Sequence, residues 1–140
     1  MSDSGKSQAE VDMVVVGAGF AGLYMTYKAQ EAGLSVTCSA AGNGVGGTWY
    51  WNRYPGARVD IECVEYSYSF SKELEQEWQW SERYAAQPEI ERYANHVAER
   101  FNLNEKIQFG TRVVSAVFNE VTRRWVVTTD QGDVVSAQYC

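Results

Sequence analysis

The chain has 140 residues, of which 45% are hydrophobic, and this is enough apolar material for one compact domain. Its 18 acidic residues outnumber the 12 basic ones and give a net charge of −6, which argues against nucleic acid and anionic membrane surfaces as partners. No apolar run approaches the roughly 20 residues that a membrane-spanning helix needs. We therefore expect no membrane partner and a cytoplasmic location.

The first ten residues and the cysteines are expected to carry no chemistry. Residues 1–10 are polar and Ser-rich without an apolar core, which is typical of a disordered lead-in rather than a signal peptide. Cys38, Cys63 and Cys140 are odd in number and widely spaced, which favours neither a disulfide nor a zinc site. We therefore expect a domain over residues 11–140 and no metal centre.

The next residues follow a strand–turn–helix–strand pattern. Val11–Val16 is a short run of mostly β-branched side chains, and the glycine-rich turn Gly17–Gly22 follows at once. Apolar residues at helical spacing then predict a helix that ends at Gly33, because glycine readily takes the left-handed conformation of a C-cap. Leu34–Ser39 again has the pattern of a strand. Together these segments predict one βαβ unit of an α/β fold.

Gly17, Gly19 and Gly22 have the spacing GxGxxG. Each of these glycines removes a side chain that would obstruct a dinucleotide pyrophosphate at the helix N-terminus or the packing of helix on strand. Because the motif follows a strand and opens a helix, it favours a Rossmann-type dinucleotide site over a tight glycine turn in another α/β fold. The acid that should bind the adenosine ribose after the second strand is missing, since that end reads CSAA. We therefore expect dinucleotide binding to be weakened or lost.

The remaining segments predict a loop, one helix and several strands. Ala41–Ser71 is rich in Gly, Tyr, Trp, Arg and Asn, which indicates a long structured loop with short helical turns. Leu74–Tyr84 is acidic and aromatic, and its pattern predicts no single structure. Pro88 is expected at the first helical position, and apolar residues from Ile90 to Phe101 predict an amphipathic helix. The final alternating segments predict an antiparallel meander of the strands Ile107–Phe109, Arg112–Phe118, Trp125–Thr129 and Val134–Tyr139.

Residues 44–60 have the sequence GVGGTWYWNRYPGARVD. This run closely resembles the GG-T/V-W-x-W-N-R-Y-P-G-A-x-x-D stretch of Baeyer–Villiger monooxygenases, particularly the phenylacetone and steroid monooxygenase branch. The resemblance extends through Tyr66–Phe70, residues 75–84, Gln87–Ile90 and the final strands, so it covers the chain from Val11 onward. It implies a truncated Rossmann-like FAD-binding βαβ unit with a C-terminal antiparallel β-meander.

In that family an FAD domain, an NADP domain and a helical insertion act together: NADPH reduces FAD, the reduced flavin reacts with O₂, and a ketone becomes an ester. The family's ribose-binding glutamate falls on Ala40, and its NADP-binding motif and catalytic arginine lie beyond Cys140. The resemblance therefore implies weakened FAD binding, no NADP-binding domain, and NADPH only through a partner. It implies FAD contacts from Gly17, Gly19, Ala21 and Gly22 at the pyrophosphate, from Gly46, Gly47, Thr48, Trp49 and Trp51 beside the ribityl chain and flavin ring, and from Asp60, Tyr66 and Val113.

Several of these residues have a second interpretation. Asp60 matches the loop aspartate that orients the family's catalytic arginine, which makes it the candidate catalytic residue, but a capping or surface carboxylate is an equal alternative. Trp49 and Trp51 suit stacking against a flat ligand, or they simply supply buried area. Outside the loop, we interpret Trp78 and Trp80 as packing residues and His96 as a solvated histidine.

Three functions remain open. The first is a truncated Baeyer–Villiger-like subunit that stabilises or completes a second chain, such as a fuller flavin monooxygenase that oxidises a ketone-type metabolite. An unfinished sheet favours such a partner, or self-association, because its open edge and apolar face need a cover. The second is a stand-alone FAD carrier reduced by a separate reductase, which Ala40 disfavours. The third is a fragment without a function. In none of these is the chain a self-sufficient enzyme.

Overall fold

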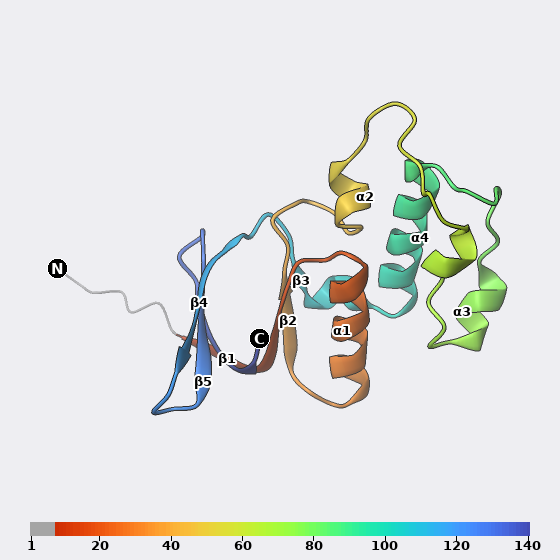
Figure 1. Ribbon diagram of the computed structural model, residues 1–140. Coiled ribbons are helices and arrows are strands. Elements are labelled where there is room, and N and C mark those ends of the chain that lie inside the picture. The colour runs from red at the N-terminus through yellow and green to blue at the C-terminus, as the bar shows by residue number, and fades with distance from the viewer. Residues whose placement is uncertain (1–7) are drawn as a thin grey trace.

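The computed structural model describes residues 8–140, which form one six-stranded sheet with the helices on one side of it (Figure 1). The strand order across the sheet is β3-β2-β1-β6-β5-β4. In chain order the elements are β1 (Ala9–Val16), α1 (Phe20–Glu31), β2 (Val36–Ser39), α2 (Thr48–Trp51), the 3₁₀ turn η1 (Cys63–Tyr66), α3 (Lys72–Glu77), α4 (Gln87–Arg100), the 3₁₀ turn η2 (Leu103–Lys106), β3 (Ile107–Gln108), β4 (Val113–Asn119), β5 (Arg124–Thr129) and β6 (Val134–Tyr139). No helix within these residues is long and apolar enough to span a membrane.

The predicted βαβ unit is confirmed. Met13–Val16 of β1 pairs in parallel with Val36–Ser39 of β2, and α1 connects the two strands. Gly33 lies just past the end of α1 with a φ of 74°, the left-handed conformation that glycine adopts without steric cost. The chain then reverses, and the amide of Leu34 donates to the carbonyl oxygen of Ala29 at 2.9 Å. The helix therefore ends for the reason that the sequence indicates.

β1 begins two residues earlier than its apolar pattern predicts. Ala9 and Glu10 pair with Val135 and Ser136 of β6. Both are exposed, so their polar surroundings in the sequence reflect a solvated strand end rather than a lack of structure. Residues 1–7 of the expected lead-in lie outside the described residues.

The predicted antiparallel meander is confirmed for β4, β5 and β6 and is wrong for the first of its four segments. β4 pairs antiparallel with β5, and β5 pairs antiparallel with β6. β3 instead pairs in parallel with β2, and β6 also pairs in parallel with β1. The reason is that α4 carries the chain back along the sheet before β3, and a helical crossover brings the next strand in parallel. Alternation in the sequence indicates extended backbone but not its partner or direction.

The main core lies between the sheet and the helices α1 and α4. The predicted apolar stripe of α4 is buried, with Tyr93, Ala94 and Val97 packed in one cluster with Leu23 of α1 and Val36 of β2. Burial of such side chains stabilises the fold by about 1.5–3 kcal/mol each. α4 begins one residue earlier than expected, so Pro88 is its second residue; a proline is tolerated there because the amides of the first turn have no intrahelical acceptor.

The segment before α4 covers the outer side of this helix. α3 is capped by Ser71, whose hydroxyl accepts from the amide of Leu74 at 3.2 Å, and an irregular stretch follows it. Trp78 is half-buried against the core, as a packing residue should be. The interpretation of His96 as a solvated side chain is wrong: its ring lies 5.4 Å from that of Trp78, and its Nε2 is 3.6 Å from the carboxylate of Glu77. Helical periodicity places His96 on the polar side of α4, but only the tertiary fold shows that α3 and Trp78 cover that side.

Candidate functional site

The glycine turn between β1 and α1 brings backbone atoms unusually close together. Gly17 has a φ of 95°, and a Cβ built on Gly22 would lie only 1.9 Å from the carbonyl oxygen of Gly17. Gly19 is the N-cap of α1 and offers no side chain to the helix, and no acidic residue occupies the first turn. The N-terminus of α1 therefore presents amides and the positive end of the helix dipole without a competing carboxylate. This is the geometry of an anion site for a phosphate or pyrophosphate.

Buried groups hold this turn in place through hydrogen bonds. The amide of Gly17 donates to the carbonyl oxygen of Ser39 at 2.8 Å, and the Cys38 thiol donates to the carbonyl oxygen of Gly17 at 3.3 Å. The Thr26 hydroxyl donates to the carbonyl oxygen of Gly22 at 2.7 Å. Burial raises the pKa of Cys38 to about 11, which keeps the thiol protonated at neutral pH. Cys38 thus acts as a hydrogen-bond donor that supports the turn and not as a nucleophile.

A second glycine pair forms the opposite wall of the site. The amide of Gly46 donates to the carbonyl oxygen of Ala18 at 2.9 Å, which ties the two turns together. Gly47 lies against Gly19, where an added Cβ would be 3.4 Å from the Gly47 Cα. α2 starts directly after this pair. The loop of residues 40–47 therefore places Thr48 and Trp49 next to the N-terminus of α1.

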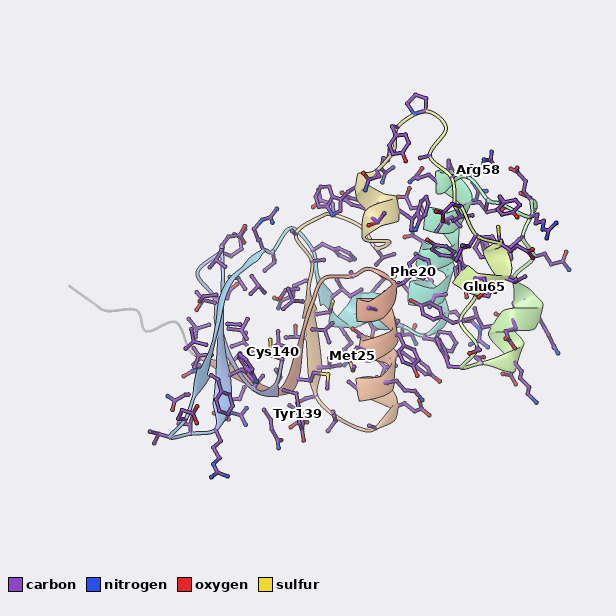
Figure 2. All side chains as sticks on the ribbon, viewed as in Figure 1. Phe20, Met25, Arg58, Glu65, Tyr139 and Cys140 are labelled. Carbon is purple, nitrogen blue, oxygen red and sulfur yellow. The ribbon has the colours of Figure 1, made fainter. Side chains whose placement is uncertain are left out.

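A cleft of roughly 400 Å³ lies between these walls. The Trp49 ring meets Tyr66 edge to face at 5.8 Å, and Phe20, at the start of α1 in Figure 2, meets Tyr66 in the same way at 5.6 Å. Eight of the residues expected at a cofactor site line this cleft. They are Gly17, Gly19, Ala21, Gly22, Gly46, Thr48, Trp49 and Tyr66.

Four expected site residues lie outside the lining. Gly47 packs against the backbone of Gly19, whereas Trp51 is 60% exposed, with its ring 4.8 Å from that of Tyr50. Val113 belongs to a separate cluster under β5 and β6. Asp60 is exposed on the segment between α2 and η1, where it makes no hydrogen bond or ion pair with any described residue. Its predicted role thus needs a group that residues 8–140 do not provide.

Two lining residues were not predicted. Val16 is the last residue of β1, and Phe20 is the variable residue directly after the second glycine of the motif. Both positions are adjacent to glycines in the sequence, so the motif itself was a signal for them.

Ala40 has no polar group free to bind a ligand. Its side chain is buried, its amide donates to the carbonyl oxygen of Gln108, and its carbonyl oxygen accepts from the amide of Thr111, each at 2.9 Å.

The segment after α2 is shaped by its own turn. The amide of Ala57 donates to the carbonyl oxygen of Tyr54 at 3.1 Å, and Gly56 has a φ of 84°. Pro55 before this glycine gives the pattern of a type II turn. Arg58 then ion-pairs with Glu82 at 2.6 Å, on the side of α4 away from the cleft (Figure 2). Residues 54–58 of the motif therefore form a turn and an ion pair of their own.

Comparisons with known proteins agree with this geometry. Residues 15–76 match the family model of the NAD(P)-binding Rossmann-like domain. The acetone monooxygenase (methyl acetate-forming) of Gordonia sp. (strain TY-5) is 47% identical over 133 residues, which are 95% of this chain and 25% of that protein. A Baeyer–Villiger monooxygenase of Pseudooceanicola batsensis is 48% identical over 132 residues, which are 94% of this chain and 24% of that protein.

Solved structures give the same result. The structure of an oxidized steroid monooxygenase bound to NADP matches with a TM-score of 0.90 and 60% identity, over 92% of this chain and 25% of that one. The chain thus spans about a quarter of the length of the relatives that it matches. The chain is therefore homologous to the N-terminal, FAD-binding part of the Baeyer–Villiger monooxygenases and has the Rossmann-like fold of that part.

Proposed function

We propose that this chain forms part of the FAD site of a Baeyer–Villiger-type flavin monooxygenase. The observation that carries the proposal is the uncapped N-terminus of α1, which faces Thr48 and Trp49 across the cleft. An FAD pyrophosphate fits this end because Gly19 has no side chain there and no carboxylate occupies the first turn. When bound, FAD would supply the electron-carrying ring for oxygen chemistry.

The residues of the chain would bind and orient this cofactor. The first amides of α1 would neutralise the pyrophosphate, and Gly17 and Gly22 let the backbone approach it closely. Trp49 and Tyr66 would exclude water from the cofactor beyond the pyrophosphate, since their rings form the far wall of the cleft. The Cys38 thiol holds the turn through its bond to the Gly17 carbonyl oxygen.

We propose that FAD binds more weakly here than at a site with an acid after β2. A carboxylate at position 40 would accept a charge-assisted hydrogen bond from the adenosine ribose, and such a bond is worth about 1.5–3 kcal/mol. Ala40 makes none through its side chain. The expected penalty in the dissociation constant is roughly tenfold to a hundredfold.

We further propose that another polypeptide segment, in the same protein or in a partner such as a fuller flavin monooxygenase, completes the oxygenase. Val16, Met25 and Tyr139 are each about half exposed and line one apolar cleft with Cys140 (Figure 2). On the β6 side, β1 is paired only as far as Met13, so the backbone of its last residues is open on that side. Open strand edges and apolar surface favour a protein cover. That further segment would contribute the NADPH-binding site, the ketone pocket and a cationic side chain to pair with Asp60.

The test is to titrate FAD into the purified chain and to follow binding by flavin fluorescence, with the molar mass measured by light scattering. Gly19→Ala should weaken binding by at least roughly tenfold, because the new methyl group, 3.4 Å from the Gly47 Cα, would narrow the approach of the proposed pyrophosphate to the N-terminus of α1 while the fold persists. Glu99→Gln, an exposed change near the far end of α4, is the matched control. Binding that is absent, or equal in wild type and Gly19→Ala, would overturn the cofactor assignment. A yellow monomer that needs no other protein for oxygenation would overturn the requirement for a further segment.

A further inference from the structure

The buried side chain of Gln87, the first residue of α4, holds the wall of the cleft that carries Trp49. Its Nε2 donates both to the carbonyl oxygen of Trp49 and to Oε2 of Glu91, the latter at 2.8 Å. Its backbone amide donates to the carbonyl oxygen of Ala57 at 2.9 Å. One residue of α4 therefore fixes both ends of the segment 49–57.

Glu91, one helical turn further along α4, extends this connection. Its Oε1 accepts from Nη2 of Arg53 at 2.7 Å, while Nε of Arg53 donates to the carbonyl oxygen of Tyr50 at 2.8 Å. The Glu91 side chain is only 20% exposed, so water weakens these bonds less than it weakens those of a surface ion pair. Gln87, Glu91 and Arg53 thus form a continuous network from α4 to the backbone of α2.

α2 needs such external support. It has four residues, and its backbone bonds all lie within one turn: the amides of Trp49, Tyr50, Trp51 and Asn52 donate to the carbonyl oxygens of Gly46, Gly47, Gly47 and Thr48, at 3.1, 2.9, 3.1 and 2.9 Å. A single helical turn is unstable in isolation because its nucleation fixes several residues for few hydrogen bonds. No residue of α2 is fully buried, so packing alone does not hold the turn in place.

We infer that Gln87 and Glu91 are positioning residues that act on the cofactor site through α2 and Trp49. This inference rests on the proposed function, because it assigns to these residues the placement of one wall of the FAD cleft. Neither residue lines the cleft. Loss of the Gln87 side-chain amide should let α2 and the Trp49 ring move away from Tyr66, and this should weaken FAD binding without removing any ligand contact.

A double-mutant cycle on the whole chain tests this coupling. Gln87→Leu removes the amide at similar volume and should weaken FAD binding by roughly tenfold, the effect expected from losing the buried hydrogen bond to the Trp49 carbonyl oxygen. In the Trp49→Ala background the same change should weaken binding by less than about twofold, because the group that Gln87 positions is absent. Equal effects in both backgrounds would overturn the inference, since a general loss of stability acts independently of Trp49.

A second readout needs no FAD and separates the inference from the proposed function. Gln87→Leu should speed hydrogen exchange at the amides of Trp51 and Asn52 by roughly tenfold, whereas the amides of β1 and the Glu99→Gln control should not change. Unchanged exchange at α2 would overturn the inference. If wild type binds no FAD, the proposed function fails, and the exchange result still decides whether Gln87 positions α2.

Arg53→Gln covers the case in which Gln87→Leu does not fold. The Arg53 side chain is 53% exposed, so its loss leaves no cavity in the core. It removes the bonds to Glu91 and to the Tyr50 carbonyl oxygen, and it should speed exchange at α2 in the same direction by a smaller factor. An unchanged rate in this variant would also contradict the network.

Discussion

Replacing Gly22 with alanine should destabilise the fold far more than the same change at Gly19. A Cβ added at Gly22 would lie 1.9 Å from the Gly17 carbonyl oxygen, although real Cβ contacts essentially never fall below 3.0 Å. That oxygen is fixed, because it accepts from Cys38 and because the Gly17 amide is bonded to Ser39. The N-terminus of α1 must therefore move by about 1 Å, which disturbs its buried face at a cost on the order of 3 kcal/mol.

Gly19→Ala provides the contrast within the same turn. Its Cβ would be 3.4 Å from the Gly47 Cα, and the φ of Gly19 is −80°, which alanine adopts without strain. We expect a cost below about 1 kcal/mol. Urea unfolding followed by tryptophan fluorescence should then show a midpoint lower by about 1.5 M for Gly22→Ala and nearly unchanged for Gly19→Ala. Equal midpoints would show that the turn relaxes around a methyl group and would refute the argument from close approach.

Three further predictions concern the cofactor, pH and the exposed surface. Ala40→Glu should tighten FAD binding by roughly tenfold, measured by fluorescence titration, because it restores a ribose acceptor; unchanged affinity would place the ribose elsewhere. Burial raises the pKa of Cys38 from 9.0 to about 11, so only the unfolded thiol ionises between these values. Stability should therefore fall as the pH rises from 9 to 11, by on the order of 2 kcal/mol, and urea unfolding of Cys38→Ala should show a smaller fall; an equal fall would assign the effect to other groups. Met25→Lys should weaken association with the completing segment or partner, because Met25 lines the exposed apolar cleft beside Tyr139. Light scattering of the chain mixed with that segment or partner should then give a lower molar mass than for wild type. An unchanged molar mass of the complex would mean that this cleft is not the interface.

The local course of the chain was largely predictable from the sequence. Short-range rules determine the ends of α1, because Gly19 opens it and Gly33 ends it in a left-handed conformation. The stripe from Ile90 to Val97 likewise predicts the buried face of α4. The glycine spacing and the motif of residues 44–60 predict a dinucleotide-type site, and the cleft gathers most of the residues so identified. These signals suffice because they depend on backbone conformation and periodicity within a few residues.

Sheet topology and the second layer of the site were decided only by the tertiary structure. β3 pairs in parallel with β2, and β6 pairs in parallel with β1. Both pairings depend on how α4 and the final strands return to the sheet, which no alternation pattern encodes. Trp49 and Trp51 lie two residues apart in a one-turn helix, and only packing determines that Trp49 faces the cleft and Trp51 faces solvent. Gln87 is separated by 38 residues from the carbonyl group it binds. The sequence by itself thus determines the elements and the glycine turn, whereas long-range packing selects which of their side chains meet, because those contacts join segments that carry no local mark of one another.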